Sequence, residues 1–209
     1  MSFVTHQIKK QVGLFVTRSA RTLVFITCVA AASILSSCYS TDTGTSLTTE
    51  TFGPWVTWTT AGQPGQDPYT RVHYARLGAL PLNSDSSQIF TARTDSDGRR
   101  LHSSCDYIIE GHSLPTHWWS FTAFDDYGRL IPNTADRYAF TSDTVAYKAD
   151  GTFAVTLSRD AQPGNWLPTG GAGRLAATFQ LVDLGIRALT REDGALEKAL
   201  PVIRRSACR

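Results

Sequence analysis

Carboxylates are the first residues of this chain that could do chemistry. Paired carboxylates hydrolyse glycosidic bonds when a cleft brings them together, and the candidates are Asp95, Asp97, Asp125 and Asp126. The segment 95–98 (Asp-Ser-Asp-Gly) also begins like a calcium loop, but the further oxygen ligands, including a terminal Glu, are missing. We therefore expect a tight turn, in which the aspartates accept backbone N–H groups and Gly98 has a positive φ.

Three histidines form the next group, and they have Glu110 near them in the sequence: His102, His112 and His117. Their spacing fits no zinc pattern, so we expect surface or loop side chains and predict no metal and no cofactor. Segment 111–115 (Gly-His-Ser-Leu-Pro) approaches a nucleophile elbow, but Pro115 replaces the second glycine and no helix pattern follows. The sequence therefore indicates no catalytic residue.

Trp118 and Trp119 form an informative pair because neighbouring residues of a strand point to opposite faces. Trp119, Phe121 and Ala123 are uniformly apolar and are predicted to face the core. Trp118 and Thr122 then lie on the other face, where an aromatic ring beside hydroxyl groups suits stacking on a sugar or another flat ligand. The alternative is that a further segment covers this face.

Three more residues are candidates for the walls of such a binding surface: Asn165, Trp166 and Arg137. They would add polar and aromatic groups beside Trp118. The interpretation that we favour for these three is structural, with each acting as a turn or strut residue.

Strands must position most of these side chains. Apolar and polar residues alternate with period two through 151–158 and 174–181. Residues 145–148 and 152–158 are expected to form a hairpin that turns on Asp150 and Gly151. Further strands are expected at 55–60, 88–94, 105–110 and 118–124.

Helix is scarce in the body of the chain. The best candidate is 67–80, where Asp67 can cap and Pro68 suits the first turn, and a shorter helix is expected within 190–200. Many strands with few crossover helices predict a mainly β fold, an antiparallel jelly-roll-like β-sandwich with one or two short helices.

The N-terminal region has the character of an export segment. The apolar run Leu23–Leu35 follows four basic residues and no acidic one. The residues at the end of this run, 35–38 (Leu-Ser-Ser-Cys), resemble a bacterial lipobox, in which Cys38 would be acylated and would become the mature N-terminus. The alternatives are an uncleaved anchor, for which Thr22 and residues 36–39 would extend a run shorter than about 17–25 residues, and ordinary secretory cleavage.

Each of these forms places the folded part outside the cytoplasm, and the first two hold it at a membrane. We expect residues 1–38 to be a signal peptide or anchor, 39–52 to be a flexible Ser/Thr-rich tether and 53–209 to be one β-sandwich domain. The expected partners are the membrane, through the anchor or a lipid, and a glycan or envelope protein.

The charge follows the same division. The whole chain has 20 Lys and Arg against 18 Asp and Glu, a net charge of +2. Because four of the basic residues precede Cys38, the exported part has 16 against 18, a net charge of −2. Without a basic stripe and interleaved aromatic residues, nucleic acid is not an expected partner.

The four cysteines divide into two pairs. Cys28 lies in the apolar run and Cys38 at the lipobox. Cys105 and Cys208 remain, an even pair in an oxidising compartment, and we predict a disulfide between them. The alternative is two buried free thiols.

Several short motifs in this order resemble the domain-of-unknown-function family 1214, over about Gly53 to Cys208. They are Gly-Pro-Trp at 53–55, Asp-Pro-Tyr-Thr-Arg at 67–71, Thr-Asp-Ser-Asp-Gly at 94–98, Trp-Trp-Ser at 118–120, Asn-Trp-Leu-Pro-Thr at 165–169 and the late cysteine. The resemblance implies a jelly-roll-like β-sandwich, often behind an N-terminal membrane segment. It brings no established reaction and no catalytic set.

The function that we expect is that of a membrane-tethered bacterial cell-envelope protein, which acts as a binding or structural module. The alternative is an envelope hydrolase or glycan-processing enzyme, which requires the four aspartates to share a cleft.

Overall fold

The computed structural model describes residues 2–114, 116–182 and 195–209, which form two compact units divided after Gly44. The first unit is helix α1, Ser2–Thr43. Its stretch Ala20–Thr43 has 24 residues and is long and apolar enough to cross a membrane, as a signal sequence also can be. At about 1.5 Å per residue this stretch exceeds the roughly 30 Å of a bilayer core.

Polar residues inside this apolar stretch do not interrupt the helix. Thr27 and Ser33 donate hydrogen bonds to the carbonyl oxygens of Leu23 and Val29, one turn earlier. Their hydroxyl groups are thereby satisfied within α1, which is how such side chains are tolerated in an apolar helix. The helix extends beyond the run Leu23–Leu35 on both sides.

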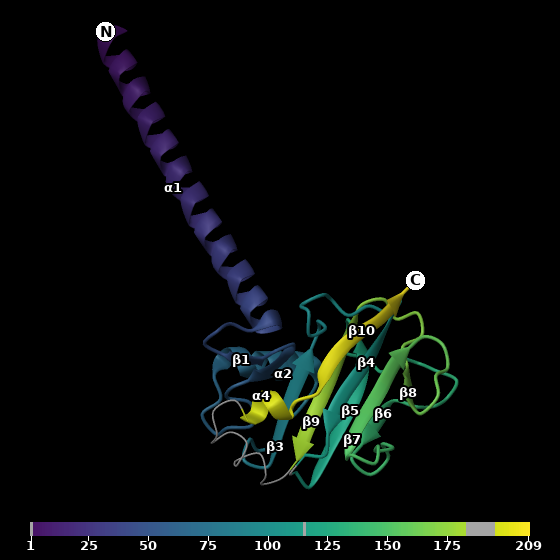
Figure 1. The fold of residues 1–209 in the computed structure, drawn as a ribbon. Coiled ribbons are helices and arrows are strands. Elements are labelled where there is room, and N and C mark those ends of the chain that lie inside the picture. The colour runs from purple at the N-terminus through teal and green to yellow at the C-terminus, as the bar shows by residue number, and fades with distance from the viewer. Residues whose placement is uncertain (1, 115, 183–194) are drawn as a thin grey trace. The chain divides into compact units, whose positions relative to one another are not determined.

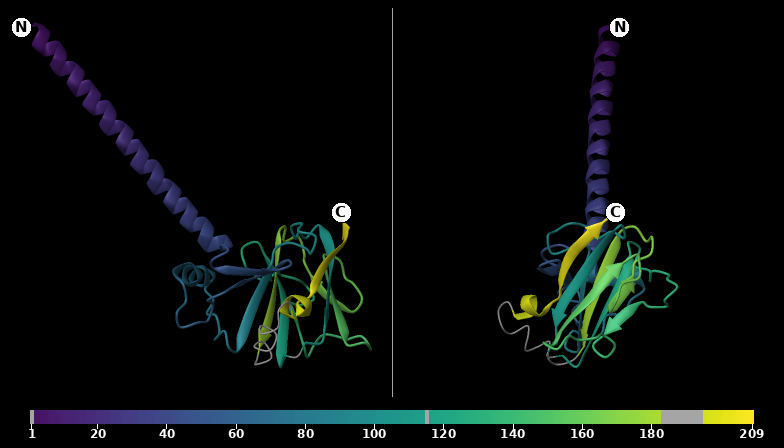
Figure 2. Two further views of the ribbon diagram at one scale, coloured as in Figure 1. Left: turned by 60° about the vertical axis from the view of Figure 1, so that its left-hand side comes forward. Right: turned by 45° about the vertical axis from the view of Figure 1, so that its right-hand side comes forward.

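The second unit contains two β-sheets (Figures 1 and 2). The six-stranded sheet has the order β1-β2-β3-β9-β5-β6. Its strands are β1 (Thr49–Phe52), β2 (Trp55–Trp58), β3 (Ser87–Ala92), β9 (Leu175–Val182), β5 (Trp118–Asp125) and β6 (Ala139–Thr141). The four-stranded sheet has the order β10-β4-β7-β8, with β10 (Val202–Cys208), β4 (Cys105–His112), β7 (Thr152–Ser158) and β8 (Asn165–Pro168).

This architecture confirms the prediction of a mainly β fold with few helices behind an N-terminal apolar helix. One pair departs from the antiparallel arrangement that we expected: β7 and β8 are parallel, with Val155 opposite Asn165. Residues 159–164 lead the chain back along β7, so β8 runs in the same direction as its neighbour.

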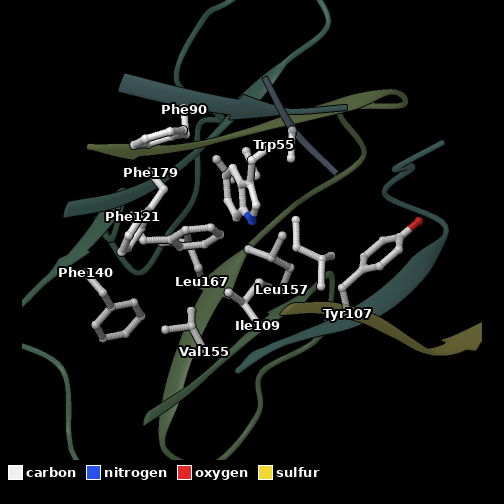
Figure 3. Close-up of a cluster of buried hydrophobic side chains, with 14 of the residues drawn as sticks. Trp55, Phe90, Tyr107, Ile109, Phe121, Phe140, Val155, Leu157, Leu167 and Phe179 are labelled. Carbon is white, nitrogen blue, oxygen red and sulfur yellow. The ribbon is translucent and has the colours of Figure 1, made fainter. Parts of the chain in front are cut away.

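The hydrophobic core lies between the two sheets, and Figure 3 shows side chains from both of them pointing toward one another. Phe90, Phe121 and Phe179 come from one sheet, and Ile109 and Leu157 come from the other. The alternating apolar positions of the sequence therefore become one shared core, as period two predicts.

Helix α2, Pro68–Leu77, begins where the sequence predicts. The side chain of Asp67 accepts hydrogen bonds from the backbone N–H groups of Tyr69 and Thr70, and Thr60 donates to the same carboxylate. Partial burial raises the pKa of Asp67, but these hydrogen bonds outweigh that effect and hold the pKa below its ordinary value. The helix ends before residue 80 because Gly78, with φ 63°, forms its left-handed cap.

The second expected helix corresponds in part to α4, Ala195–Ala199, while residues 190–194 lie outside the described residues. The expected hairpin keeps its turn, with Gly151 at φ 78°, but its first arm is only a single bridge from Tyr147 to Phe153. Residues 145–148 contribute no full strand, and β8 occupies that edge of β7 from Val155 onward.

The structure differs from the expected tether at 39–52. Its first residues complete α1, and its last four form β1, which pairs with β2 along its whole length. A turn held by Thr45 and Thr48 leads into this strand. Threonines suit a strand that gains backbone partners, and Phe52 packs edge-on against Phe90 of the core.

Candidate functional site

The outward face of β5 carries the first candidate surface. Trp118, Ser120 and Thr122 alternate with core residues and are partly exposed. Ser120 lies beside Gln180 of β9, and Thr122 lies beside Thr178. We call these five residues the Trp118 surface. It consists of one aromatic ring, three hydroxyl groups and one amide.

The opposite face of β5 is core, as the alternation predicts. Trp119 is 1% exposed, and its ring stacks on Phe153 of the other sheet, with the ring centroids 4.6 Å apart. Gly111 is needed beside this stack, because a Cβ at that position would lie 2.5 Å from the Phe153 ring. This packing accounts for the glycine of segment 111–115, whose Pro115 lies outside the described residues.

Asn165, Trp166 and Arg137 gather at a different place. They lie at or beside β8, where Leu167 faces the core and Trp166 points away from it. Because β5 and β8 belong to different sheets, Trp118 and Trp166 lie on opposite outer faces of the sandwich. The binding surface predicted from the sequence is therefore divided. Trp118 and Thr122 lie on one sheet, and Asn165, Trp166 and Arg137 lie at the other.

The second group is bonded to backbone atoms. The amide nitrogen of Asn165 donates to the carbonyl oxygens of Ala146 and Ala154, and its oxygen accepts from the N–H of Ala146. The indole N–H of Trp166 donates to the Ser158 carbonyl, and Arg137 donates to the Trp166 carbonyl at 3.1 Å. These contacts agree with the strut interpretation.

The four aspartates are each held by arginines or backbone N–H groups. Asp95 is 1% exposed, accepts the N–H groups of Asp97 and Arg99, and lies 3.2 Å from Nε of Arg205. Asp97 pairs with Arg99. Asp126 lies between two arginines, Arg93 at 3.4 Å and Arg174 at 3.6 Å.

Segments 95–99 and 125–129 are two turns of the same form, Asp-x-x-Gly-Arg. Gly98 and Gly128 have φ values of 82° and 74°, which confirms the turn that we expected in place of a calcium loop. Slight burial raises the pKa of Asp125, but hydrogen bonds from Arg129 and Tyr127 hold it below its ordinary value. A glycosidase acid needs the opposite shift, so this geometry does not favour the hydrolase alternative.

The histidines lie in separate surroundings. Nδ1 of His102 accepts from the backbone of Ser104, Nε2 of His112 lies 3.3 Å from the carbonyl of Lys198, and His117 is exposed. Within residues 2–114, 116–182 and 195–209, no group of three or more His, Cys, Asp or Glu side chains is arranged to hold a metal ion.

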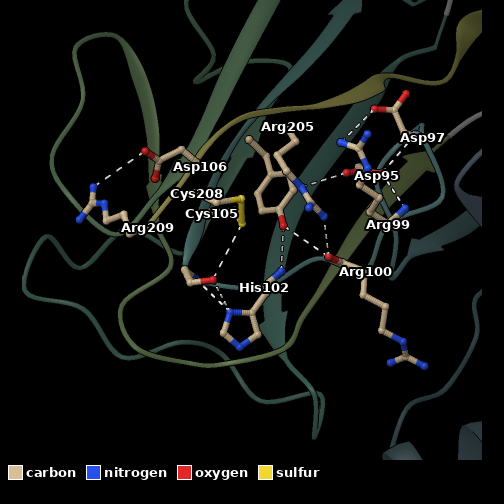
Figure 4. Close-up of a disulfide and its surroundings, with 12 residues drawn as sticks. Asp95, Asp97, Arg99, Arg100, His102, Cys105, Asp106, Arg205, Cys208 and Arg209 are labelled. Atoms are coloured by element: carbon tan, nitrogen blue, oxygen red, sulfur yellow. Dashed lines mark hydrogen bonds and ion pairs between the residues drawn. A yellow bond between two sulfur atoms is a disulfide. The ribbon is translucent and has the colours of Figure 1, made fainter.

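Cys105 and Cys208 form the predicted disulfide, which joins β4 to the last residue of β10 (Figure 4). Arg205 of the same strand lies over the ring of Tyr107 and donates to the carbonyl of Arg100. The C-terminal strand is therefore fixed to the sandwich by a covalent bond and by the partly buried pair of Arg205 with Asp95.

Sequence reasoning missed a pocket of about 200 Å³ between β2, β3 and α2. Its polar lining includes Thr57, Tyr74 and Ser84. These residues are far apart in the sequence, and none belongs to a motif. The one sequence signal near them is the capping pattern at Asp67, which positions α2.

Comparison with known proteins finds a family model that matches part of the chain, and it assigns no activity. A crystal structure of the VPA0106 protein from Vibrio parahaemolyticus is 19% identical, with a TM-score of 0.53, and the alignment covers 68% of this chain and 36% of that one. An uncharacterised protein from Burkholderia cenocepacia is 19% identical, with a TM-score of 0.40 and coverage of 61% and 31%. The first likeness is one of fold.

This chain thus spans about a third of the length of those two structures. A search among curated proteins found no match. The family model described as "Protein of unknown function (DUF1214)" matches residues 86–183, a shorter part than the motifs suggested, which begins before β3 and ends after β9. Residues 86–183 of this chain therefore match the model of the family that the sequence motifs indicated.

Proposed function

We propose that this chain is a membrane-tethered protein of the bacterial cell envelope, whose sandwich binds a glycan on the extracytoplasmic side. The observation that carries the binding role is the Trp118 surface. An envelope protein is the other class of partner that the sequence suggests, and a surface that combines an aromatic ring with hydroxyl and amide groups fits a glycan better.

The tether rests on the apolar stretch Ala20–Thr43 of α1. The basic residues that precede this stretch favour an orientation with the N-terminus in the cytoplasm and the sandwich outside. The same segment, cut before Cys38, would leave a lipid anchor instead. Both forms keep the sandwich at a membrane.

The disulfide supports the same compartment. Bonds such as Cys105–Cys208 persist where the environment is oxidising and are rare in the reducing cytoplasm. The bacterial periplasm is oxidising, so an exported domain can keep this bond throughout its life.

The binding role rests on the chemistry of the Trp118 surface. Sugars present an apolar C–H face together with hydroxyl groups, and an aromatic ring beside hydroxyl and amide groups matches both. Gln180 donates to Ser87 of β3, which fixes its amide on this face. Trp118 is the first residue of β5 and lies opposite Val182 of β9, while β6 pairs with β5 from Ser120 to Thr122.

Protease treatment of intact spheroplasts tests the location. We expect added protease to degrade the sandwich without lysis, and we expect the untreated chain to sediment with membranes. A sandwich that is protected until lysis, or a full chain recovered in the cytosol, would contradict the proposal. A fatty-acid analogue that labels the wild type but not Cys38→Ala identifies the lipid anchor, and membrane retention without labelling identifies the spanning helix.

A further inference from the structure

The pocket beside α2 exists because two neighbouring strands separate. β2 pairs with β3 only where Trp55 meets Ala92 and Val56 meets Thr91. β3 nevertheless continues to pair with β9 on its other side as far as Ser87. From Thr57 onward, β2 and β3 therefore lie apart, and their residues line facing walls of the cavity of about 200 Å³.

The remaining walls are held in place by close packing. Tyr74 of α2 and the segment 81–85 complete the lining. The ring of Trp58 stacks on His73 with the centroids 4.3 Å apart, which fixes α2 against β2. Gly62 has a φ of 73°, and a Cβ there would lie 1.9 Å from the carbonyl oxygen of Leu82. The loop can thus approach segment 81–85 only with glycine at position 62.

Two side chains in this lining carry a hydroxyl group and belong to buried residues, Thr57 and Tyr74. Thr57 is 3% exposed and Tyr74 is 7% exposed. Neither hydroxyl group makes a hydrogen bond to another residue of the described part of the chain. A hydroxyl group both donates and accepts hydrogen bonds, so these two groups can bond to a ligand that enters the pocket. Burial raises the pKa of Tyr74 to about 12, which keeps the phenol protonated as a donor.

The rest of the lining selects the class of ligand. Asp85 is the single charged residue among the described lining residues, so phosphates and other anions find no cation there. Trp58, Leu82 and Ile89 supply apolar contacts, and Ser84 adds a further hydroxyl group. The volume lies below the roughly 300–1,000 Å³ of sites for drug-sized ligands, which limits the occupant to one small ring.

We infer that this pocket binds one neutral sugar unit, through hydrogen bonds to the hydroxyl groups of Thr57 and Tyr74 and apolar contact with Trp58. This site is distinct from the Trp118 surface, and it lies largely outside residues 86–183. The sugar is either a free monosaccharide or the end of a glycan chain, since both present the same ring.

Titration of the full-length chain with simple sugars tests this inference. The protein is kept in a zwitterionic detergent, because detergents with sugar headgroups would compete. Glucose, galactose, N-acetylglucosamine and their methyl glycosides are added, and binding is followed by saturation-transfer NMR and tryptophan fluorescence. We expect at least one of these sugars to bind. A methyl glycoside that binds as tightly as its free sugar indicates a chain end, and binding of the free sugar alone indicates a monosaccharide.

Two variants remove a hydroxyl group with little change in shape, Tyr74→Phe and Thr57→Val. Each is expected to weaken binding about five- to tenfold, the effect of one lost hydrogen bond. Tyr69→Phe is the matched control on the same helix, where the side chain is exposed and outside the pocket. Thermal unfolding shows whether each variant keeps the wild-type fold.

Trp118→Ala separates this inference from the proposed function, because it should leave sugar binding in the pocket unchanged. The inference is overturned if no sugar binds, if inorganic phosphate binds in place of the sugars, or if folded Tyr74→Phe and Thr57→Val bind like the wild type. Loss of sugar binding in Trp118→Ala alone would move the site to the Trp118 surface and would also overturn the inference.

Discussion

Replacing Cys105 and Cys208 with serine is expected to lower the free energy of unfolding of the sandwich by about 4–5 kcal/mol. The two cysteines are 103 residues apart, so the disulfide closes a loop that includes most of the domain. In the chain-entropy model, a loop of this length gives one of the larger stabilisations that a single disulfide provides.

Urea unfolding of the oxidised chain and of the double variant measures this effect. Cys28→Ser is the matched control, because Cys28 is a free, exposed cysteine of α1. Its unfolding curve for the sandwich should equal that of the wild type. An unchanged unfolding midpoint in the Cys105 and Cys208 variant would contradict the prediction, and it would mean that the ion pairs and the β4 ladder hold β10 without the disulfide.

Trp119→Ala is expected to destabilise the sandwich by about 3–5 kcal/mol, the usual cost of emptying a large aromatic core site. Its ring packs against Phe153 and Phe179, one from each sheet, so the substitution removes contacts across the whole core. Trp118→Ala should leave stability near that of the wild type, because this side chain is partly exposed on the outer face. Urea unfolding of both variants provides the comparison, and equal destabilisation would show that both faces of β5 are buried.

The faces of β5 could be predicted because the pattern is local. Trp119, Phe121 and Ala123 alternate with polar neighbours, and period two alone assigns the core face. The start of α2 was equally predictable, since Asp67 and Pro68 lie next to the helix that they begin. The disulfide could be predicted because Cys105 and Cys208 are the two cysteines outside the apolar run and the lipobox, and because an oxidising compartment was expected. Each of these predictions needed no knowledge of distant neighbours.

The elements that the sequence did not reveal depend on distant partners. β1 consists of four residues with no apolar alternation, and it exists because β2 offers an open edge. β10 is rich in polar residues, and its place is set by β4. The separation of Trp118 from Trp166 depends on which sheet each strand joins. The pocket arises from the divergence of β2 and β3, which no local pattern encodes.

Binding to a glycan polymer tests the central claim most directly. The full-length chain in detergent is mixed with purified peptidoglycan sacculi and centrifuged, and the bound fraction is measured for the wild type and Trp118→Ala. Tyr127→Ala is the control, because Tyr127 is an exposed aromatic residue in the turn after β5. We predict that the wild type and Tyr127→Ala sediment with the sacculi. We predict that Trp118→Ala binds at least about tenfold more weakly. A wild-type chain that stays in the supernatant, or a Trp118→Ala variant that sediments like the wild type, would contradict the account.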